Sequence, residues 1–365
     1  MANIYQIGAG LVGRTMALDL SKDHTVFLAD NDLEKLELIK REDNSIHISK
    51  VDVKRLDEVS NFIKYADIVL LAVPGFLGFQ TLKNIIINKK DAVDISFSPE
   101  DTLSLNELAK ENNVTVIVDA GVAPGIPNYI LGHHDKSFSI NSFEYFVGGL
   151  PKKPKPPFNY KAPFSPIDVI EEYTRPARMM INSKVITKPA LSDIELMKFG
   201  ELGTLEVFNT DGLRSILKTF PHISNMKEKT IRYPGHAKLM TKYIDEGKFS
   251  PEKIEDTVNE LFEEWKLEPQ EKEFTILDII LKSEREKFHY RLYDEYDKKT
   301  NSSSMSRTTG FTATATVNLL LNNLYQESGV FPPEIIGREN LCWKFINNYL
   351  IDRNVVLKDL SLSTN

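Results

Sequence analysis

Cysteine is almost absent from this sequence of 365 residues, which contains only Cys342. A single cysteine excludes a disulfide within the chain and any metal site built from several cysteines. We interpret Cys342 as a small apolar residue beside Trp343. No pair of histidines four residues apart lies next to a carboxylate, so the sequence predicts no metal site.

The sequence also lacks long apolar runs and an excess of positive charge. No apolar stretch reaches 18 residues, and the start MANIYQIGAGLVG lacks the basic and apolar regions of a signal peptide. Lys and Arg number 45 against 52 Asp and Glu, for a net charge of −7, unlike the basic footprint of a nucleic-acid binder. We therefore expect a cytoplasmic protein that binds neither nucleic acid nor membrane.

The first 120 residues alternate short apolar runs with segments of helical period, in a chain long enough for two domains. Strands are expected at Asn3–Ile7, His24–Ala29, Ile46–Ile48, Asp67–Ala72, Ala92–Ile95 and Val114–Val118. Strands joined by helical crossovers predict a parallel sheet covered on both faces. The expected fold is a doubly wound α/β Rossmann sheet of order 3-2-1-4-5-6, with its ligand crevice at the carboxyl ends of the strands.

A GxGxxG motif follows the first of these strands. It consists of Gly8, Ala9, Gly10, Leu11, Val12 and Gly13. In a dinucleotide-binding turn the first glycine allows the tight bend, the second lets the pyrophosphate approach, and the third lets helix and strand pack closely. Asp30 ends the second strand, where a carboxylate accepts hydrogen bonds from ribose hydroxyls and repels a 2′-phosphate. The motif predicts NAD as cofactor, in preference to NADP.

Other residues just past strand ends are predicted to line the same crevice. They are Asp52, Val53, Ala72, Val73, Pro74 and Ser96. For Asp52 the pattern fits a contact on the adenine side and a plain turn or cap equally well.

The pattern changes after Gly121, where longer alternating segments appear at Ser142–Val147, Lys272–Leu281 and Lys287–Asp294. A helix is expected to begin with Ser250 as N-cap and Pro251 at its first position. Strands mixed with separate helices predict a second, α+β domain on a large mixed or antiparallel sheet. Residues 151–166 hold six prolines interleaved with aromatic residues, which favours an ordered loop.

A series of blocks along the chain resembles the saccharopine dehydrogenase superfamily, and most closely its L-lysine 6-dehydrogenase branch. The blocks are GAGLVG, LAVPGFLGF at 71–79, VDISFSPED at 93–101, DAGVAPGIPN at 119–128, VGGLPKKPKPP at 147–157, IEEYTRPAR at 170–178, TDGLRSIL at 210–217, TIRYPGHAK at 230–238, SSMSRTTGFTA at 303–313 and GVFPPEIIG at 329–337. The resemblance implies a Rossmann domain of residues 1–125 plus 328–365. It also implies a substrate-binding and dimerisation domain of residues 126–327, and hence a homodimer.

The resemblance further implies NAD-dependent oxidation of the ε-amine of L-lysine to the 6-semialdehyde, which cyclises, with release of ammonia. Hydride leaves only from a neutral amine, so a base must deprotonate an ammonium whose pKa in solution is about 10.4. Asp94 and Asp119, at neighbouring strand ends, and Glu144 are candidates for this catalytic role. His236 is a candidate proton shuttle, because an unperturbed histidine titrates near neutrality.

The substrate carboxylate needs a cation, preferably an arginine that binds with two hydrogen bonds. Arg232 is the first candidate. Arg175 is the second, although it fits a contact between subunits at least as well, and Gly121 is predicted to lie beside the substrate.

Two alternatives stay open at the level of sequence. One is reductive formation of a secondary amine, as in saccharopine or carboxynorspermidine dehydrogenases, whose additional carboxylate could be bound by Lys152, Lys153, Lys155 or Lys161. The other is a non-catalytic protein that senses NAD, which would bind the dinucleotide and turn over no amine.

Overall fold

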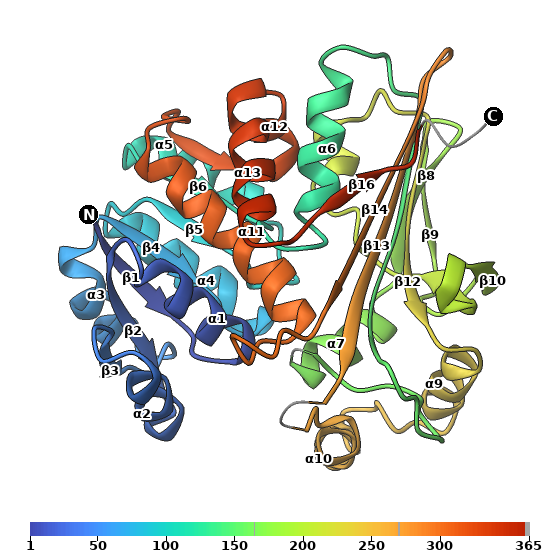
Figure 1. Ribbon diagram of the computed structural model, residues 1–365, viewed down its shortest axis with the longest axis horizontal. Helices are drawn as coiled ribbons and strands as arrows, with labels where there is room; N and C mark the ends of the chain where they lie inside the picture. Colours follow the sequence, from blue (N-terminus) through green and yellow to red (C-terminus); the bar gives the residue numbers. More distant parts are fainter. Residues whose placement is uncertain (164, 269–270, 362–365) are drawn as a thin grey trace. The chain divides into compact units, whose positions relative to one another are not determined.

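The structure is a computed structural model that describes residues 1–163, 165–268 and 271–361 (Figure 1). The chain divides into two compact units. The first comprises Met1–Ser137 and Ser306–Asn354, and the second comprises Phe138–Met305 and the segment from Val355. A parallel sheet in the first unit and a mixed sheet in the second confirm the predicted α/β fold class.

The parallel sheet of the first unit has the order β15-β6-β5-β4-β1-β2-β3 among the described residues. Its strands are β1 (Asn3–Ile7), β2 (Thr25–Asp30), β3 (His47–Lys50), β4 (Ile68–Leu71), β5 (Ala92–Asp94), β6 (Thr115–Ile117) and β15 (Gly329–Phe331). The six predicted strands and their order are confirmed, with ends that differ by one or two residues. All four residues of β4 are buried, as expected where helices cover both faces of a parallel sheet.

Helices connect these strands and complete the first unit. They are α1 (Leu11–Leu20), α2 (Leu33–Glu42), α3 (Leu56–Phe62), α4 (Gly75–Ile87), α5 (Asn106–Glu111), α6 (Ile126–Asp135), α11 (Ser304–Leu321), α12 (Pro333–Gly337) and α13 (Asn340–Asp352), with 3-10 turns at Ile63–Tyr65 and Thr102–Leu105. α11 begins at Ser304, two residues before the first unit resumes.

The edge strand β15 was not predicted, because three residues between Ser328 and Pro332 give no periodic signal. It extends the sheet by pairing in parallel with β6.

The units also divide the chain differently from the predicted domains. Residues 126–137 and 306–327, expected in the second domain, belong to the first unit, where Asn128 of α6 hydrogen-bonds Glu334 of α12 (2.8 Å). A Cβ at Gly132 would lie 2.0 Å from the Glu334 carbonyl oxygen, so α6 and α12 pack backbone against backbone. The segment from Val355, expected with the Rossmann domain, belongs to the second unit, where β16 (Leu357–Asp359) pairs with β14.

The second unit is built on a mixed sheet with the path β10-β11-β12-β7-β13-β14-β16, to which β8 and β9 add through β12. Among the described strands of this second sheet, only β7 and β12 pair in parallel. The strands are β7 (Ser142–Pro151), β8 (Ala177–Ile181), β9 (Lys184–Lys188), β10 (Glu195–Lys198), β11 (Thr204–Asn209), β12 (Asn225–Arg232), β13 (Glu273–Lys282), β14 (Lys287–Glu295) and β16.

The helices of this unit are α7 (Pro166–Thr174), α8 (Ile216–Thr219), α9 (His236–Asp245) and α10 (Ile254–Trp265), with a 3-10 turn at Gly200–Leu202. α7, α9 and α10 contribute Tyr173, Met240 and Trp265 to one buried cluster with the sheet residue Phe208. The prediction that α10 begins at Ser250 was wrong: residues 250–253 form a turn, in which the Ser250 carbonyl accepts from the Lys253 amide.

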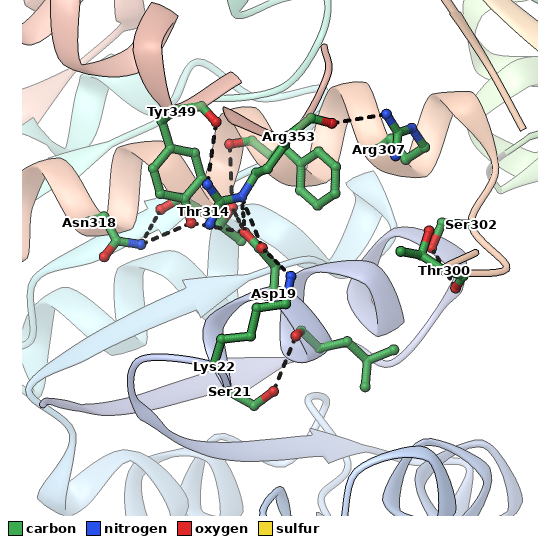
Figure 2. Close-up of polar contacts among 12 residues, drawn as sticks. Asp19, Ser21, Lys22, Thr300, Ser302, Arg307, Thr314, Asn318, Tyr349 and Arg353 are labelled. Carbon is green, nitrogen blue, oxygen red and sulfur yellow. Dashed lines mark hydrogen bonds and ion pairs between the residues drawn. The ribbon is translucent and has the colours of Figure 1, made fainter. Parts of the chain in front are cut away.

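A buried carboxylate joins three helices of the first unit (Figure 2). Asp19 of α1 accepts hydrogen bonds from Thr314 of α11 (2.8 Å) and Tyr349 of α13 (2.9 Å). Arg353 follows α13, donates to both oxygens of Asp19 and lies over the Tyr349 ring. Burial alone would raise the pKa of Asp19, but hydrogen bonds and charge from Arg353, with Thr314 and Lys22, outweigh it and lower the pKa. Asp19 is therefore ionised, and it ties the helix of the GxGxxG motif to two C-terminal helices.

We expect Asp19→Asn to lower the free energy of unfolding by roughly 3–5 kcal/mol at pH 7, because it leaves Arg353 without its buried counter-charge. The contribution of Asp19 is present above its unfolded pKa of about 3.9 and is lost as the pH falls through the lower folded value. Urea unfolding at pH 7 and pH 3 measures both effects. Lys22→Gln is the control: Lys22 pairs with the same carboxylate but is 63% exposed, so its loss should cost under about 1 kcal/mol. Equal losses in the two variants would contradict the assignment.

Candidate functional site

The turn between β1 and α1 has the geometry that a dinucleotide requires. Gly8 has a φ of +110°, and a Cβ there would lie 2.2 Å from the Ala72 carbonyl oxygen. A Cβ at Gly13 would lie 2.2 Å from the Gly8 carbonyl oxygen, so both positions require glycine for packing. A Cβ at Gly10 would instead meet no atom within 4 Å. Open space therefore lies in front of Gly10, the residue at which a pyrophosphate approaches the helix N-terminus.

Two side chains hold this turn in place. Gln6 donates to the carbonyl oxygens of Gly8 (3.0 Å) and Gly13 (2.7 Å). The Asp30 carboxylate accepts from the amides of Ala9 (2.7 Å) and Asp32 (3.0 Å), so the acidic residue that ends β2 lies directly beside the motif. Each Asp30 oxygen has a further lone pair with which to accept a ribose hydroxyl. The residues present fit an adenine dinucleotide.

The remaining predicted cofactor positions fall into two groups. Ala72, Val73 and Pro74 run from the end of β4 to the start of α4, and Ala72 donates to the Ile7 carbonyl (2.8 Å). Ser96 follows β5, and its amide donates to Asp94 (2.9 Å). Asp52 instead accepts from the Lys54 amide (3.0 Å) as a turn residue, and Val53 packs against the core of the unit.

Asp94 and Asp119 come from neighbouring strands of the sheet, as expected. Asp94 is the last residue of β5, and its carbonyl accepts from Ala120, next to Asp119 (3.3 Å). Both carboxylates are buried, and Asp119 has a φ of +55°, a backbone conformation that non-glycine residues rarely adopt and that concentrates at functional sites. Gly121 follows in a tight turn, in which its amide donates to the Pro124 carbonyl (3.1 Å).

Arg232 and His236 belong to one hydrogen-bonded chain inside the second unit. Arg232 Nε donates to the Tyr173 hydroxyl (2.8 Å), which donates to His236 Nε2 (2.9 Å), and His236 Nδ1 donates to the Phe158 carbonyl (2.8 Å). The guanidinium also lies over the ring of Tyr160 and pairs with Glu172 (3.5 Å). Burial, with the charge of Arg232, lowers the pKa of His236 to about 3. The expectation that His236 titrates near neutrality is therefore wrong, because the imidazole is enclosed and stays neutral.

A second chain of polar contacts starts from Glu228, which is buried on the same face of β12 as Arg232. Glu228 contacts the Thr210 hydroxyl (2.7 Å), which contacts the Thr230 hydroxyl (2.9 Å), and Thr230 donates to Glu172. Three oxygen-to-oxygen contacts need three hydrogens, and the two hydroxyls supply only two. The third must come from a carboxyl group. Burial and the charge of Glu172 raise the pKa of Glu228 to about 8, so Glu228 holds that proton at pH 7.

Glu144 and Arg175 lie apart from this face. Glu144 pairs with Lys227 across β7 and β12 (2.9 Å), and Lys227 points to the opposite face from Glu228 because side chains alternate along a strand. Arg175 ends α7 and pairs with Glu171 one turn earlier (3.0 Å). Neither residue is brought together with Arg232.

Sequence reasoning missed Glu172, Tyr173, Thr210 and Glu228 as parts of a polar site. One signal was available, because Glu228, Thr230 and Arg232 alternate along a strand and therefore share a face. The pairing of that face with α7 depends on tertiary packing, which the alternation does not reveal.

Two general features concern the described residues only. No group of three or more histidine, cysteine, aspartate or glutamate side chains is arranged to hold a metal ion in residues 1–163, 165–268 and 271–361. Over the same ranges, no helix has the length and apolar character to span a bilayer.

Two family models match the chain along most of its length. The saccharopine dehydrogenase NADP binding domain matches residues 4–117, and the saccharopine dehydrogenase C-terminal domain matches residues 121–349. Apo saccharopine dehydrogenase (L-Glu forming) from Saccharomyces cerevisiae has a similar fold, with a TM-score of 0.79 over 98% of this chain and 99% of that one, at 17% identity.

Two curated relatives match this chain over less than half of their own length. Bovine mitochondrial alpha-aminoadipic semialdehyde synthase is 24% identical over 66% of this chain but only 28% of its own length. Saccharopine dehydrogenase [NADP(+), L-glutamate-forming] of Pyricularia oryzae is 26% identical over 51% of this chain and 44% of its own. This chain thus spans less than half of each of these two proteins.

The fold and the turn at Gly8–Gly13 define a nucleotide-binding Rossmann protein with a second, mixed-sheet unit. The chain belongs to the saccharopine dehydrogenase family. Its resemblance to that superfamily is confirmed, whereas membership of the lysine 6-dehydrogenase branch stays a prediction.

We expect Gly10→Val to weaken dinucleotide binding by at least tenfold while the unit stays folded. The backbone at Gly10 has a φ of −68°, which any residue adopts, so the added side chain fills only the open space. Gly13→Ala is the matched variant and should destabilise the fold instead, because its Cβ meets the Gly8 carbonyl. Calorimetric titration with NAD and NADP, together with urea unfolding, separates the two effects. Unchanged dinucleotide affinity in Gly10→Val would mean that Gly10 is only a turn residue.

Glu228 and His236 should contribute to stability with opposite dependence on pH. The unfolded chain protonates His236 below its ordinary value of 6.5 while the folded chain does so only near 3, so this term adds stability as the pH rises from 3 to 6.5. Glu228 keeps its proton up to about 8 in the folded chain but loses it near 4.5 when unfolded, so its term loses stability as the pH rises from 4.5 to 8. The two terms cancel between pH 4.5 and 6.5.

When one of the two residues is replaced, the pH dependence of the free energy of unfolding should therefore show the contribution of the other. Relative to the parent protein, His236→Gln should lose the rising term and Glu228→Gln the falling one, each about 1.4 kcal/mol per pH unit within its window. Glutamine at 228 keeps one donor and one acceptor, like a protonated carboxyl. Urea unfolding at half-unit intervals from pH 4 to pH 8 measures the differences, and curves parallel to the parent for both variants would refute the two protonation states.

Proposed function

We propose that this chain is an NAD-dependent amino-acid dehydrogenase that oxidises the ε-carbon of L-lysine to the 6-semialdehyde and releases ammonia. The observation that carries the proposal is the combination of an open dinucleotide turn with two buried carboxylates, Asp94 and Asp119, which follow neighbouring strands of the same sheet at its carboxyl edge. In open α/β sheets, ligands bind at this edge. Membership of the saccharopine dehydrogenase family supports amino-acid C–N chemistry.

We assign the catalytic roles to residues at the carboxyl edge of the parallel sheet. Asp94 and Asp119 are proposed to hold the substrate amine and accept its proton, since a carboxylate both binds the ammonium and can take a proton from it. Gly121 is proposed to lie beside the substrate. A Cβ there would lie 3.3 Å from the Pro124 carbonyl oxygen and from Thr309, so its lack of a side chain serves packing of the turn. The bound nicotinamide would supply the hydride acceptor.

The anchor for the substrate carboxylate is proposed to be Arg232, with Arg175 as the second candidate. Besides its contact with the Tyr160 ring, Arg232 has three polar partners, Tyr173, Ile231 and Glu172. A substrate carboxylate would have to replace the Glu172 contact, which at 3.5 Å is the longest of the three. Buried Arg232 also holds the Tyr173 and His236 chain, so its substitution would affect folding as well as binding.

The preference for NAD rests on the acidic end of β2. Asp30 ends β2 beside the turn and Asp32 caps α2 two residues later, and their carboxylates are proposed to repel a 2′-phosphate. The matching family model is described as NADP binding, so the preference of this chain is a proposal about its own residues.

A second candidate is the oxidation of saccharopine, which breaks the same ε-carbon to nitrogen bond and releases glutamate in place of ammonia. The likeness in fold to the L-Glu forming saccharopine dehydrogenase, over nearly the full chain, favours it. It requires cations for the additional carboxylates. Of the four lysines proposed for them, Lys152 pairs with Glu295 and Lys161 donates to the Glu264 carbonyl (2.9 Å), which leaves Lys153 and Lys155.

The test is a turnover panel that follows reduced nicotinamide with NAD or NADP. Lysine, saccharopine, ornithine and cadaverine are offered, together with the reductive reactions from aldehydes and amines. We expect lysine with NAD to give the fastest turnover, and Asp30→Ala to narrow the NAD preference by removing the repulsion. Saccharopine as the faster substrate would support the second candidate. Dinucleotide binding without turnover of any amine would contradict both and leave a non-catalytic role in NAD sensing.

A further inference from the structure

The guanidinium of Arg232 is enclosed but only partly hydrogen-bonded. Its side chain is 3% exposed, Nε donates to the Tyr173 hydroxyl (2.8 Å) and Nη1 donates to the Ile231 carbonyl (2.9 Å). Among the described residues, Nη2 has only the ion-pair contact with Glu172 Oε2, at 3.5 Å. Nη2 is not one of the fully enclosed polar atoms that lack a hydrogen bond, so it keeps some contact with solvent. One corner of a buried cation is therefore open to an acceptor.

A second group without a hydrogen bond lies over this guanidinium. The centroid of the Tyr160 ring lies 4.4 Å from Arg232 Cζ, and the Tyr160 hydroxyl is buried with no partner among the described residues. A buried hydroxyl is normally hydrogen-bonded. Burial raises the pKa of Tyr160, so the hydroxyl keeps its hydrogen and can donate it. A carboxylate placed at Nη2 would bring acceptor oxygens to both groups.

Glu172 holds part of this place in the structure. Its side chain is 18% exposed, its Oε2 faces Nη2 of Arg232, and its Oε1 accepts from the Thr230 hydroxyl. A ligand carboxylate that binds Nη2 would therefore come close to an ionised carboxylate. Two carboxylates that share one enclosed site do not both stay ionised, and one of them takes up a proton.

The other titratable groups near Glu172 are not available for that proton. Glu228 already holds one, and Tyr173 keeps its hydrogen because burial raises its pKa. His236 has both ring nitrogens in hydrogen bonds, and burial lowers its pKa to about 3. Asp211, the remaining acid beside Glu228, is held in an ion pair (2.7 Å). Glu172, which is partly exposed, is the group that can exchange a proton with solvent.

We propose that Glu172 is a displaceable counter-ion of Arg232, and that a substrate carboxylate binds Arg232 together with one proton, which Glu172 takes up. Before binding, Arg232 and Glu172 form a neutral pair. After binding, Arg232 pairs with the ligand carboxylate and Glu172 is a neutral carboxyl group, so the enclosed net charge does not change. Protonated Glu172 can still accept from Thr230 and can donate its own hydrogen to the ligand.

This inference rests on the proposed function, because it takes Arg232 as the anchor of the substrate carboxylate. It deepens that function by naming Glu172 as the residue that makes carboxylate binding depend on pH. A ligand without a carboxylate would leave the pair of Arg232 and Glu172 intact and would need no proton.

The test is calorimetric titration of the full-length protein saturated with NADH, which cannot accept a hydride and so prevents turnover. Lysine and cadaverine are the probes, because both carry two amines and only lysine carries the carboxylate. Titration at pH 7 in buffers that differ in enthalpy of ionisation counts the protons exchanged on binding. We expect lysine to take up about one proton more than cadaverine. The Kd of lysine should also rise by about tenfold per pH unit relative to that of cadaverine.

Glu172→Gln should abolish the difference in protons between the two probes and should bind lysine at least tenfold more tightly than the parent at pH 8, because no competing charge remains. Glu171→Gln is the matched control: Glu171 precedes Glu172 on α7 and pairs with Arg175 (3.0 Å), so its variant should exchange protons as the parent does. Tyr160→Phe should weaken lysine binding by roughly tenfold and leave cadaverine unaffected. If Glu172→Gln does not fold, the comparison of the two probes in the parent decides alone.

Equal proton counts for lysine and cadaverine in the parent would overturn the proposal, and so would an unchanged difference in Glu172→Gln. Loss of the difference in Glu171→Gln alone would move the anchor to Arg175 and also overturn it. If lysine does not bind, this inference fails together with the proposed function. If lysine is turned over in the panel above but the proton counts are equal, this inference fails alone.

Discussion

The buried carboxylate of Asp19 organises the first unit. It lies on the helix that carries the GxGxxG turn and is satisfied by Thr314, Tyr349 and Arg353, which come from almost the other end of the chain (Figure 2). A buried charge without such partners would be costly, so the position of α1 is determined by α11 and α13 as well as by the sheet. Because the turn at Gly8–Gly13 leads directly into α1, the same carboxylate helps to hold the dinucleotide site in its open geometry.

In the second unit, two buried titratable side chains avoid carrying a charge through their protonation states. Glu228 is enclosed and keeps its proton, whereas His236 is enclosed and gives its proton up. Neither therefore carries a charge at neutral pH, and the one buried cation of the group, Arg232, pairs with Glu172 and stacks on Tyr160. A face of polar side chains can in this way be buried against α7 and α9 at little electrostatic cost.

Local chemistry made much of this predictable from sequence. Apart from β3 (His47–Lys50), the predicted strands of the first unit are short, mainly apolar runs, and crossover handedness favours the doubly wound order. The strands and their order were confirmed. β15 could not be predicted, because three residues carry no period and its pairing with β6 spans most of the chain. Contacts of this kind, like those of Asp19, depend on the packing of distant segments.

In the candidate site, residues of a local motif were predictable, whereas residues positioned by tertiary packing were not. The positions of Gly8, Gly13 and Asp30 follow from a motif whose geometry is local. Glu144 and His236 were selected for residue type and position along the chain, which do not reveal the face of the sheet or the degree of enclosure. Glu144 lies on the sheet face that carries Lys227, and His236 is fully enclosed. These tertiary contacts do not match the roles expected for the two residues from sequence.

The pairing of β15 with β6 has a consequence for synthesis of the protein on the ribosome. The edge of β6 is made early, and its partner emerges roughly two hundred residues later, which takes about 10 to 40 seconds at ordinary translation rates. During that interval a strand with unpaired amides and carbonyls lies at the edge of the sheet, and Asp19 has neither Tyr349 nor Arg353 beside it. Residues 138–305 of the second unit are translated in between, so the N-terminal segment waits through most of synthesis for its complete set of native contacts.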